Sequence, residues 1–178
     1  MKLNYFLFYI VMIFFVIGCV RQEKQIEANG VVEMKLTSSA FQNNGAIPSE
    51  FTCDSSDVSP PLSISDAPAN AKSLALIMDD PDAPVGTWDH WVVFNIRPST
   101  REMTKGNEPN GVAGENSWGR TGYGGPCPPS GTHRYFFKLY ALDTMLNLPQ
   151  DTAKKELEKA MQGHIIAKAE LMGSYKRG

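Results

Sequence analysis

The sequence contains few cysteines and no excess of either charge. Among 178 residues there are 3 cysteines, and 17 lysines and arginines stand against 19 aspartates and glutamates, for a formal net charge of −2. A nearly neutral chain lacks the basic surface that a nucleic-acid-binding domain needs. We therefore expect no nucleic-acid partner.

Repeats and two familiar hydrolase motifs are also missing. No internal repeat or low-complexity stretch is visible, and no polar linker interrupts residues 31–176. The chain has neither the H-E-x-x-H spacing of zinc hydrolases nor the G-x-S-x-G elbow of serine hydrolases. Its length suits about one domain with a sizeable core. The sequence therefore predicts a single folded domain over residues 31–178, with no metal and no cofactor.

The one long hydrophobic run stands at the N-terminus. Lys2 is the only charged residue before Cys19, and residues 3–17 are almost entirely aliphatic and aromatic. A short basic start followed by an apolar stretch is typical of an export signal. Val16-Ile-Gly-Cys19 resembles a bacterial lipobox, in which the cysteine is acylated and becomes the new N-terminus. The alternatives are an uncleaved membrane anchor and a cysteine placed there by chance.

These features predict a bacterial lipoprotein with residues 1–18 as its signal peptide. The polar, aperiodic residues 19–30 would form a flexible tether behind the lipidated Cys19. Each methylene of an acyl chain adds about 0.8 kcal/mol of membrane affinity. The expected location is therefore the cell envelope, outside the cytoplasm. Val20, in place of an aspartate, favours sorting to the outer membrane in a Gram-negative cell.

Cys53 and Cys127 remain as an even pair once Cys19 is assigned to the lipid. In an oxidising compartment such a pair can form a disulfide. In the chain-entropy model a bridge of this span stabilises the fold by about 4 kcal/mol. Two separately buried thiols are the alternative, and the residues alone do not decide between them.

The apolar segments are mostly typical of strands. The expected strands, each bounded by Pro, Gly, Asn or Asp, cover Val31–Leu36, Leu74–Met78, Trp91–Ile96, Tyr135–Leu142 and Ile165–Met172. Residues 91–96 are apolar on both faces, which favours a central strand covered on both sides. In the last segment Ile165, Ala167, Ala169 and Leu171 alternate with Lys168 and Glu170, which predicts one exposed face.

One helix is expected, over residues 151–163. Asp151 can cap its N-terminus, and Gly163 stands where a left-handed C-terminal cap belongs. Its apolar stripe consists of Ala153, Leu157, Ala160 and Met161, and its charged face of Lys154, Lys155, Glu156, Glu158 and Lys159. We interpret the charged face as solvated surface. Residues 43–61 are irregular and are expected to wrap a sheet edge.

Polar side chains gather at three expected strand ends. Asp80 ends one strand, while His90 and His133 open two others. Imidazole N–H groups bind anions, and a carboxylate on the opposite ring nitrogen fixes the tautomer so that the free N–H faces the ligand, a role that suits Asp80. Tyr135 shares a strand face with His133 and can donate an O–H. The sequence therefore predicts an anion-binding cleft at a sheet rim.

Four stretches of the sequence stand out: Asp80-Pro-Asp-Ala-Pro84, Trp88-Asp-His90 with the following strand, Gly122-Tyr-Gly-Gly-Pro-Cys-Pro-Pro, and Gly131-Thr-His133-Arg-Tyr135. They resemble the signature regions of the phosphatidylethanolamine-binding protein family, also known as Raf kinase inhibitor proteins. Phe51-Thr-Cys-Asp, Ser59-Pro-Pro-Leu62 and Glu115-Asn-Ser-Trp-Gly119 are similar to the bacterial Raf-kinase-inhibitor-like branch. The resemblance spans residues 32–176.

The resemblance implies a mainly β fold, in which a large antiparallel central sheet packs on a smaller sheet with one or two flanking helices. It also implies a small cavity for phosphate-like anions and phospholipid head groups. The family's pocket positions correspond here to Asp80, His90, His133 and Tyr135, with Pro81, Asp82, Trp88 and the 122–125 loop, including Gly124, as walls. The longer C-terminal segment of eukaryotic members is not expected, and neither is inhibition of a cytosolic kinase.

The leading hypothesis is therefore a non-enzymatic, envelope-tethered protein that binds a small anionic or phosphorylated ligand and that could regulate a partner protein. Two alternatives stay open. The two histidines and Asp80 could hold a catalytic zinc ion in a hydrolase. The Gly- and Asn-rich residues 107–117 could act as the inhibitory loop of a protease inhibitor, as in some relatives.

Overall fold

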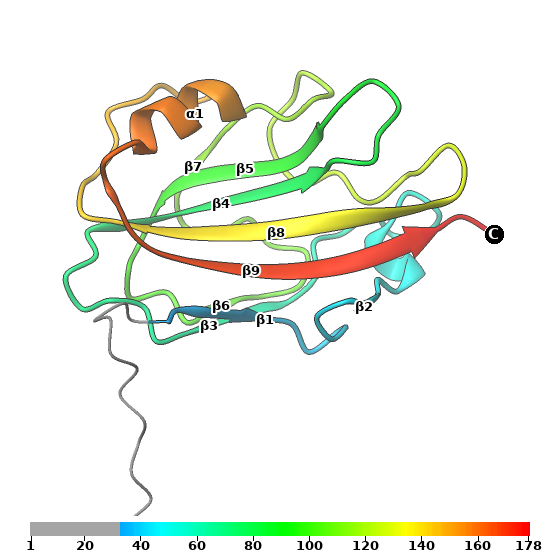
Figure 1. The fold of residues 1–178 in the computed structure, drawn as a ribbon, viewed down its shortest axis with the longest axis horizontal. Coiled ribbons are helices and arrows are strands. Elements are labelled where there is room, and N and C mark those ends of the chain that lie inside the picture. Colours follow the sequence, from blue (N-terminus) through cyan, green and yellow to red (C-terminus); the bar gives the residue numbers. More distant parts are fainter. Residues whose placement is uncertain (1–32) are drawn as a thin grey trace, which may run out of the picture. The chain divides into compact units, whose positions relative to one another are not determined.

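A six-stranded sheet organises the part of the chain that the structure describes (Figure 1). The structure is a computed structural model, and it describes residues 33–178. The expected signal peptide, the lipidation site Cys19 and the 19–30 tether lie outside the described residues. Within them, no helix has the length and apolar character needed to cross a membrane.

The large sheet has the strand order β2-β9-β8-β4-β5-β7. Its strands are β2 (Gly45–Ala46), β9 (Ile165–Lys176), β8 (Thr132–Leu142), β4 (Ser73–Asp80), β5 (Trp88–Ile96) and β7 (Val112–Ala113). All neighbours are antiparallel except β2, which runs parallel to β9. The sheet is therefore antiparallel, as expected, except at the edge where β2 pairs with β9.

A small sheet and one short helix cover the two faces of the large sheet (Figure 1). The small sheet has the order β1-β3-β6, with β1 at Lys35–Thr37, β3 at Leu62–Ser65 and β6 at Glu102–Met103. Helix α1 is Lys154–Met161, and a single turn of 3-10 helix, η1, spans Ser49–Phe51. These bounds confirm the mainly β fold of two sheets with a flanking helix.

Alternation along β4 explains the two-sided core. Leu74, Leu76 and Met78 pack into the core shared with the small sheet. Ala75 and Ile77 pack with Leu157 and Met161 of α1. Because successive side chains of a strand point to opposite faces, an unbroken apolar run fills both cores at once. Residues 91–96 behave in the same way, which confirms the expected interior strand.

Four of the five expected strands are present and extend beyond their predicted bounds. The fifth, expected at Val31–Leu36, begins only at Lys35, since Glu33 and Met34 are not in a strand and residues 31–32 lie outside the described residues. The short strands β2, β3, β6 and β7 carry no comparable apolar run and were not predicted. Ile165 does not follow the expected alternation, since it is 44% exposed. A register shift opposite Ala141 and Leu142 interrupts the pairing of β8 with β9 at this end and turns Ile165 outward.

Helix α1 differs from its prediction at the N-terminus. Asp151 does not cap it, because the helix begins after Ala153, which makes no side-chain cap bond. The preceding chain is instead paired with Glu115, whose N–H donates to the Thr152 carbonyl oxygen over 3.1 Å. Gly163 does adopt the expected left-handed conformation, with φ +79°.

Lys154 is not a solvated surface residue, contrary to the prediction. Its Nζ donates to Asp79 Oδ2 over 2.6 Å and to Asp89 Oδ1 over 3.0 Å, and its side chain is only 13% exposed. Burial opposes its charge, but the two carboxylates outweigh burial and raise the pKa of Lys154. Lys138 Nζ also donates to Asp79, over 2.8 Å. The charge of the buried Asp79 therefore depends on two ammonium groups.

We predict that Lys154→Met lowers the free energy of unfolding by about 3 kcal/mol, because it removes one partner of a buried charge. Lys159→Met, on the exposed side of the same helix, should change it by less than about 0.5 kcal/mol. Urea unfolding followed by circular dichroism gives both values. Equal midpoints for the two variants would contradict the structural role of Lys154.

Candidate functional site

Antiparallel pairing brings the three predicted strand ends to one rim of the large sheet. The last residue of β4, Asp80, is paired with Trp88 at the start of β5. Asp79 is paired with Phe136, close to the start of β8. Because β4 runs opposite to both neighbours, its end must lie beside both of their beginnings. Asp80, His90 and His133 are thereby brought together, as the sequence predicts.

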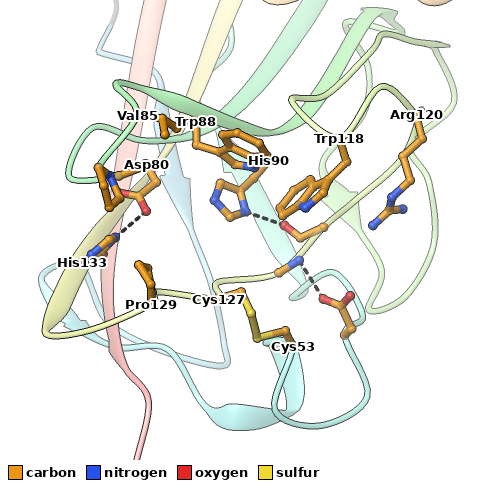
Figure 2. Close-up of a pocket in the computed structure, with 15 residues that line it drawn as sticks. Cys53, Asp80, Val85, Trp88, His90, Trp118, Arg120, Cys127, Pro129 and His133 are labelled. Carbon is orange, nitrogen blue, oxygen red and sulfur yellow. Dashed lines mark hydrogen bonds and ion pairs between the residues drawn. A yellow bond between two sulfur atoms is a disulfide. The ribbon is translucent and has the colours of Figure 1, made fainter.

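A cavity of about 360 Å³ opens at this rim. Figure 2 shows Asp80 and His133 on one side of it and His90 facing them. Trp88, Trp118 and Arg120 form another part of the wall, and the Cys53–Cys127 disulfide and Pro129 close the opposite part. The lining therefore combines ionisable groups with aromatic and aliphatic surface, as small-molecule sites usually do.

Asp80 and His133 form a buried pair. His133 Nδ1 lies 2.7 Å from Asp80 Oδ2, and the side chains are 9% and 5% exposed. The other carboxylate oxygen, Oδ1, accepts the N–H of Asp82 over 2.8 Å. Asp80 therefore has both oxygens engaged, which fixes the rotamer of the carboxylate and the plane of the His133 ring.

His90 is held by backbone and by aromatic rings. Its Nδ1 lies 2.7 Å from the Gly124 carbonyl oxygen. Its ring meets those of Trp118 and Tyr135 edge to face, at centroid distances of 5.0 and 5.2 Å. Burial lowers the pKa of His90, although the Gly124 carbonyl and nearby carboxylates oppose that effect.

A β-bulge places His90 on the cavity side of the sheet. Met78 is paired with Trp91 and the next residue, Asp79, with Asp89, so His90 is the unpaired extra residue. Without the bulge, alternation from Trp91 would direct His90 toward the helix face. The same shift places Asp89 on that face, where it binds Lys154.

These bonds fix where each imidazole carries its proton. A carbonyl oxygen can only accept, so His90 Nδ1 must be the protonated nitrogen. A carboxylate favours the same tautomer in His133. Each neutral ring therefore keeps its lone pair on Nε2 and offers an N–H there only as an imidazolium. This corrects the expectation that Asp80 leaves a neutral N–H free for a ligand.

The other predicted site residues divide into two groups. Trp88 and Gly124 line the cavity, whereas Pro81, Asp82 and Tyr135 do not. Asp82 instead accepts two side-chain bonds from Arg134, at 2.9 and 2.7 Å. Arg134 thereby lowers the pKa of Asp82 to about 2, so Asp82 serves the rim as a structural anion.

Tyr135 lies behind the cavity. It is fully buried, and its hydroxyl has no hydrogen-bond partner within residues 33–178. Burial, reinforced by the Asp80 carboxylate, raises the pKa of Tyr135 far above its usual range. The neutral phenol therefore supports the His90 ring through its edge-to-face contact.

Sequence reasoning missed several lining residues. Arg120, Trp118 and Asp57 line the cavity, and the guanidinium of Arg120 lies 5.7 Å from the Trp118 ring centroid. Trp118 belongs to the Glu115–Gly119 stretch that carried part of the resemblance, so a signal for it existed. Arg120 and Asp57 have no pattern around them that singles out a cleft residue.

Cys53 and Cys127 form a disulfide, with their Cα atoms 5.4 Å apart. This settles the alternative between a bridge and separate thiols. The bridge joins residues 74 positions apart and forms part of the cavity wall. Over residues 33–178, no group of three or more His, Cys, Asp or Glu side chains is placed to hold a metal ion.

Comparison with known proteins places this cavity in a family context. Residues 37–176 match the family model described as phosphatidylethanolamine-binding protein. A UPF0098 protein of Methanothermobacter thermautotrophicus is 52% identical over 151 residues, which cover 82% of this chain and 100% of the archaeal protein. A UPF0098 protein of Aquifex aeolicus is 47% identical over 162 residues, covering 86% of this chain and 94% of the relative.

Two solved structures share the fold. The phosphatidylethanolamine-binding protein homolog CT736 of Chlamydia trachomatis superposes with a TM-score of 0.80 at 45% identity, covering 83% of this chain and 99% of the other. YbcL of E. coli, described as a new member of the mammalian family, gives a TM-score of 0.76 at 29% identity, with 82% and 99% covered.

We predict that neutral His90 carries its proton on Nδ1 and titrates below the ordinary histidine value of about 6.5. Long-range proton–nitrogen NMR spectra over a pH series report both properties. His164, which is 47% exposed and pairs with Asp143, provides the internal comparison. An Nε2-protonated His90 at neutral pH would contradict the assignment.

Proposed function

The chain belongs to the phosphatidylethanolamine-binding protein family, and from that premise we propose that it is a non-enzymatic binding protein tethered to the cell envelope. Its cavity would take a small phosphorylated anion, with a phospholipid head group as one source of that chemistry. The observation that carries the proposal is the pair of buried imidazoles, His90 and His133, which both line the cavity with their Nδ1 atoms already engaged.

The charges around the cavity support a ligand whose binding depends on pH. The ionisable lining residues are Asp57, Asp80, Arg120, His90 and His133. With neutral imidazoles, the two carboxylates and one guanidinium leave a net charge of −1; with both imidazoles protonated, the net charge becomes +1. An anion therefore favours the protonated rings, and by linkage protonation favours the anion.

A phosphate monoester suits this arrangement better than a permanent dianion such as sulfate. The second pKa of a phosphoryl group is near 6, so below that pH most of the phosphate still carries a proton. That O–H can donate to the lone pair of a neutral Nε2, while the ester's other oxygens accept from an imidazolium. Sulfate has no proton to donate and can bind only the imidazolium form.

The envelope location is the second part of the proposal. It is supported by the lipobox-like Val16-Ile-Gly-Cys19 after an apolar N-terminal stretch. The Cys53–Cys127 bridge is consistent with it, because disulfides persist mainly in oxidising compartments. An acylated Cys19 would hold the cavity close to a membrane surface, where phospholipid head groups are abundant.

We predict that phosphate and phosphoethanolamine bind about tenfold more tightly at pH 5.5 than at pH 7.5, because binding takes up a proton on an imidazole. Sulfate, whose own charge is constant over this range, should show the larger relative gain. Isothermal titration calorimetry in buffers of different ionisation heat gives both the affinity and the number of protons taken up.

Histidine variants test whether phosphate binds at the cavity rather than elsewhere on the protein. His90→Ala and His133→Ala should each reduce the pH dependence, because one titratable imidazole remains, and should each weaken phosphate binding at pH 5.5 by about tenfold or more. His164→Ala changes an exposed histidine outside the cavity and should bind as the unmodified protein does. Phosphate binding that is unchanged in His133→Ala would refute the proposed pocket.

We also predict that Cys19→Ser releases the protein from the membrane fraction and abolishes incorporation of labelled palmitate in a bacterial host. Each buried methylene adds about 0.8 kcal/mol of membrane affinity, so loss of all acyl chains removes the lipid anchor. The matched control is Cys53→Ser with Cys127→Ser, which leaves the lipobox intact and should remain labelled. If the protein with Cys19 intact is membrane-bound but takes up no palmitate, the N-terminal segment is an uncleaved anchor instead.

A further inference from the structure

The disulfide in the cavity wall is exposed to solvent. Cys53 and Cys127 are both exposed residues, and both line the cavity. Exposed disulfides are in general easier to reduce than buried ones and are the ones that take part in regulation. A covalent bond that contributes only to stability has no need to lie at the surface of a ligand cavity.

The chain before Cys127 is held by several hydrogen bonds besides the disulfide. The N–H of Gly124 donates to the His90 carbonyl oxygen over 3.0 Å, and that of Gly125 to Asp57 Oδ1 over 2.7 Å. The N–H of Cys53 donates to the Pro126 carbonyl oxygen over 3.1 Å. Reduction would therefore leave residues 123–126 largely in place.

The chain after that point has, besides the disulfide, few hydrogen bonds. None of the turn and loop backbone hydrogen bonds formed within residues 33–178 involves residues 127–131. Pro128 and Pro129 have no N–H to donate. Of the five residues, all but Pro128 are exposed. The next backbone pairing begins at Thr132, in β8.

This weakly held segment forms the wall between the two imidazoles. Cys127 and Pro129 line the cavity, Gly124 before them binds His90, and His133 follows them (Figure 2). We propose that the Cys53–Cys127 disulfide is a thiol-sensitive clamp on the pocket, whose reduction by a protein dithiol frees residues 127–131 and weakens anion binding. The effect on binding rests on the proposed function, whereas the release of the segment does not.

Thiol–disulfide exchange with the protein dithiol needs no other reactant. A thiolate of a C-x-x-C dithiol attacks one sulfur of the disulfide, the sulfur–sulfur bond breaks, and the second sulfur leaves as a thiolate that takes up a proton. The second thiol of the dithiol, as a thiolate, then attacks the first sulfur of the dithiol, the mixed disulfide bond breaks, and the remaining protein cysteine leaves as a thiolate that takes up a proton. Two electrons and two protons pass to Cys53 and Cys127, and the dithiol becomes a disulfide.

The test compares the oxidised and reduced protein. After reduction by a C-x-x-C protein dithiol without denaturant, the affinity for inorganic phosphate at pH 5.5 should fall about tenfold, the loss expected when binding must order one or two further residues. Heteronuclear NOE values of Cys127, Ser130 and Gly131, the residues of the segment with an N–H, should fall at the same time. Near-ultraviolet circular dichroism establishes that the reduced protein is folded.

Two variants keep the result independent of stability. Cys53→Ser with Cys127→Ser should reproduce the reduced state in both measurements. Leu157→Ala destabilises the protein from α1, on the other face of the sheet, and should keep the affinity and the NOE values of the oxidised protein. An equal loss of affinity in Leu157→Ala would attribute the effect to stability and overturn the clamp.

The remaining outcomes are also decisive. A disulfide that resists the dithiol, or a reduced protein that binds phosphate within twofold of the oxidised one, overturns the clamp. Oxidised protein that binds no phosphate at all overturns the proposed function instead. In that event the NOE values alone decide whether reduction frees residues 127–131, and unchanged values overturn the clamp as well.

Discussion

The candidate site depends on the pairing of β4 with an antiparallel strand on each side. This strand is buried over its whole length, from Ser73 to Asp80, and contributes to the cores on both faces of the sheet. Because it runs opposite to β5 and β8, its end must lie beside the beginnings of both. The sheet rim therefore collects side chains that lie up to 53 positions apart, such as Asp80 and His133. Burial of β4 fixes this register, since a slip by one residue would turn Leu74, Leu76 and Met78 out of their core.

The chemistry of the site follows from which atoms are already bonded. Both imidazoles use Nδ1 for the protein, His90 toward a carbonyl oxygen and His133 toward a carboxylate. Their Nε2 atoms can then accept from a protonated ligand or, once charged, donate to an anion. With only one guanidinium, Arg120, against two carboxylates in the wall, the sign of the cavity charge is decided by the histidines. Proton uptake and ligand binding are therefore expected to be coupled.

The sequence predicted those parts of the fold that a continuous apolar pattern specifies. The strands around Leu74–Met78, Trp91–Ile96 and Tyr135–Leu142 were found because a strand buried on both faces leaves an unbroken apolar run. Strands of two to four residues leave no such pattern, because their pairing is decided by distant neighbours. Lys154 was misjudged for a related reason: its helix position is on the polar face, and only the tertiary fold brings Asp79 and Asp89 to it.

Within the candidate site, residue types were easier to predict than orientations. Asp80, His90 and His133 stood at expected strand ends, and antiparallel pairing was enough to bring them together. The placement of His90 on the cavity side required a bulge, which no local pattern revealed. Tyr135 is on the same face of its strand as His133, as expected. It is two residues further from the rim, however, and therefore lies in the core. Its burial, and not its position in the alternation, decides that it supports His90.

Asp79 and Asp80 show how one strand end serves two separate structures. Consecutive residues of a strand point to opposite faces, so Asp79 faces α1 and Asp80 faces the cavity. Asp79 is neutralised by Lys138 and Lys154, whereas Asp80 binds the titratable His133. The two ammonium groups tie Asp79 to β8 and α1, whereas Asp80 orients the His133 ring at the cavity. The same residue type, one position apart, thus anchors the helix on one face and, on the other, orients a histidine of the candidate site.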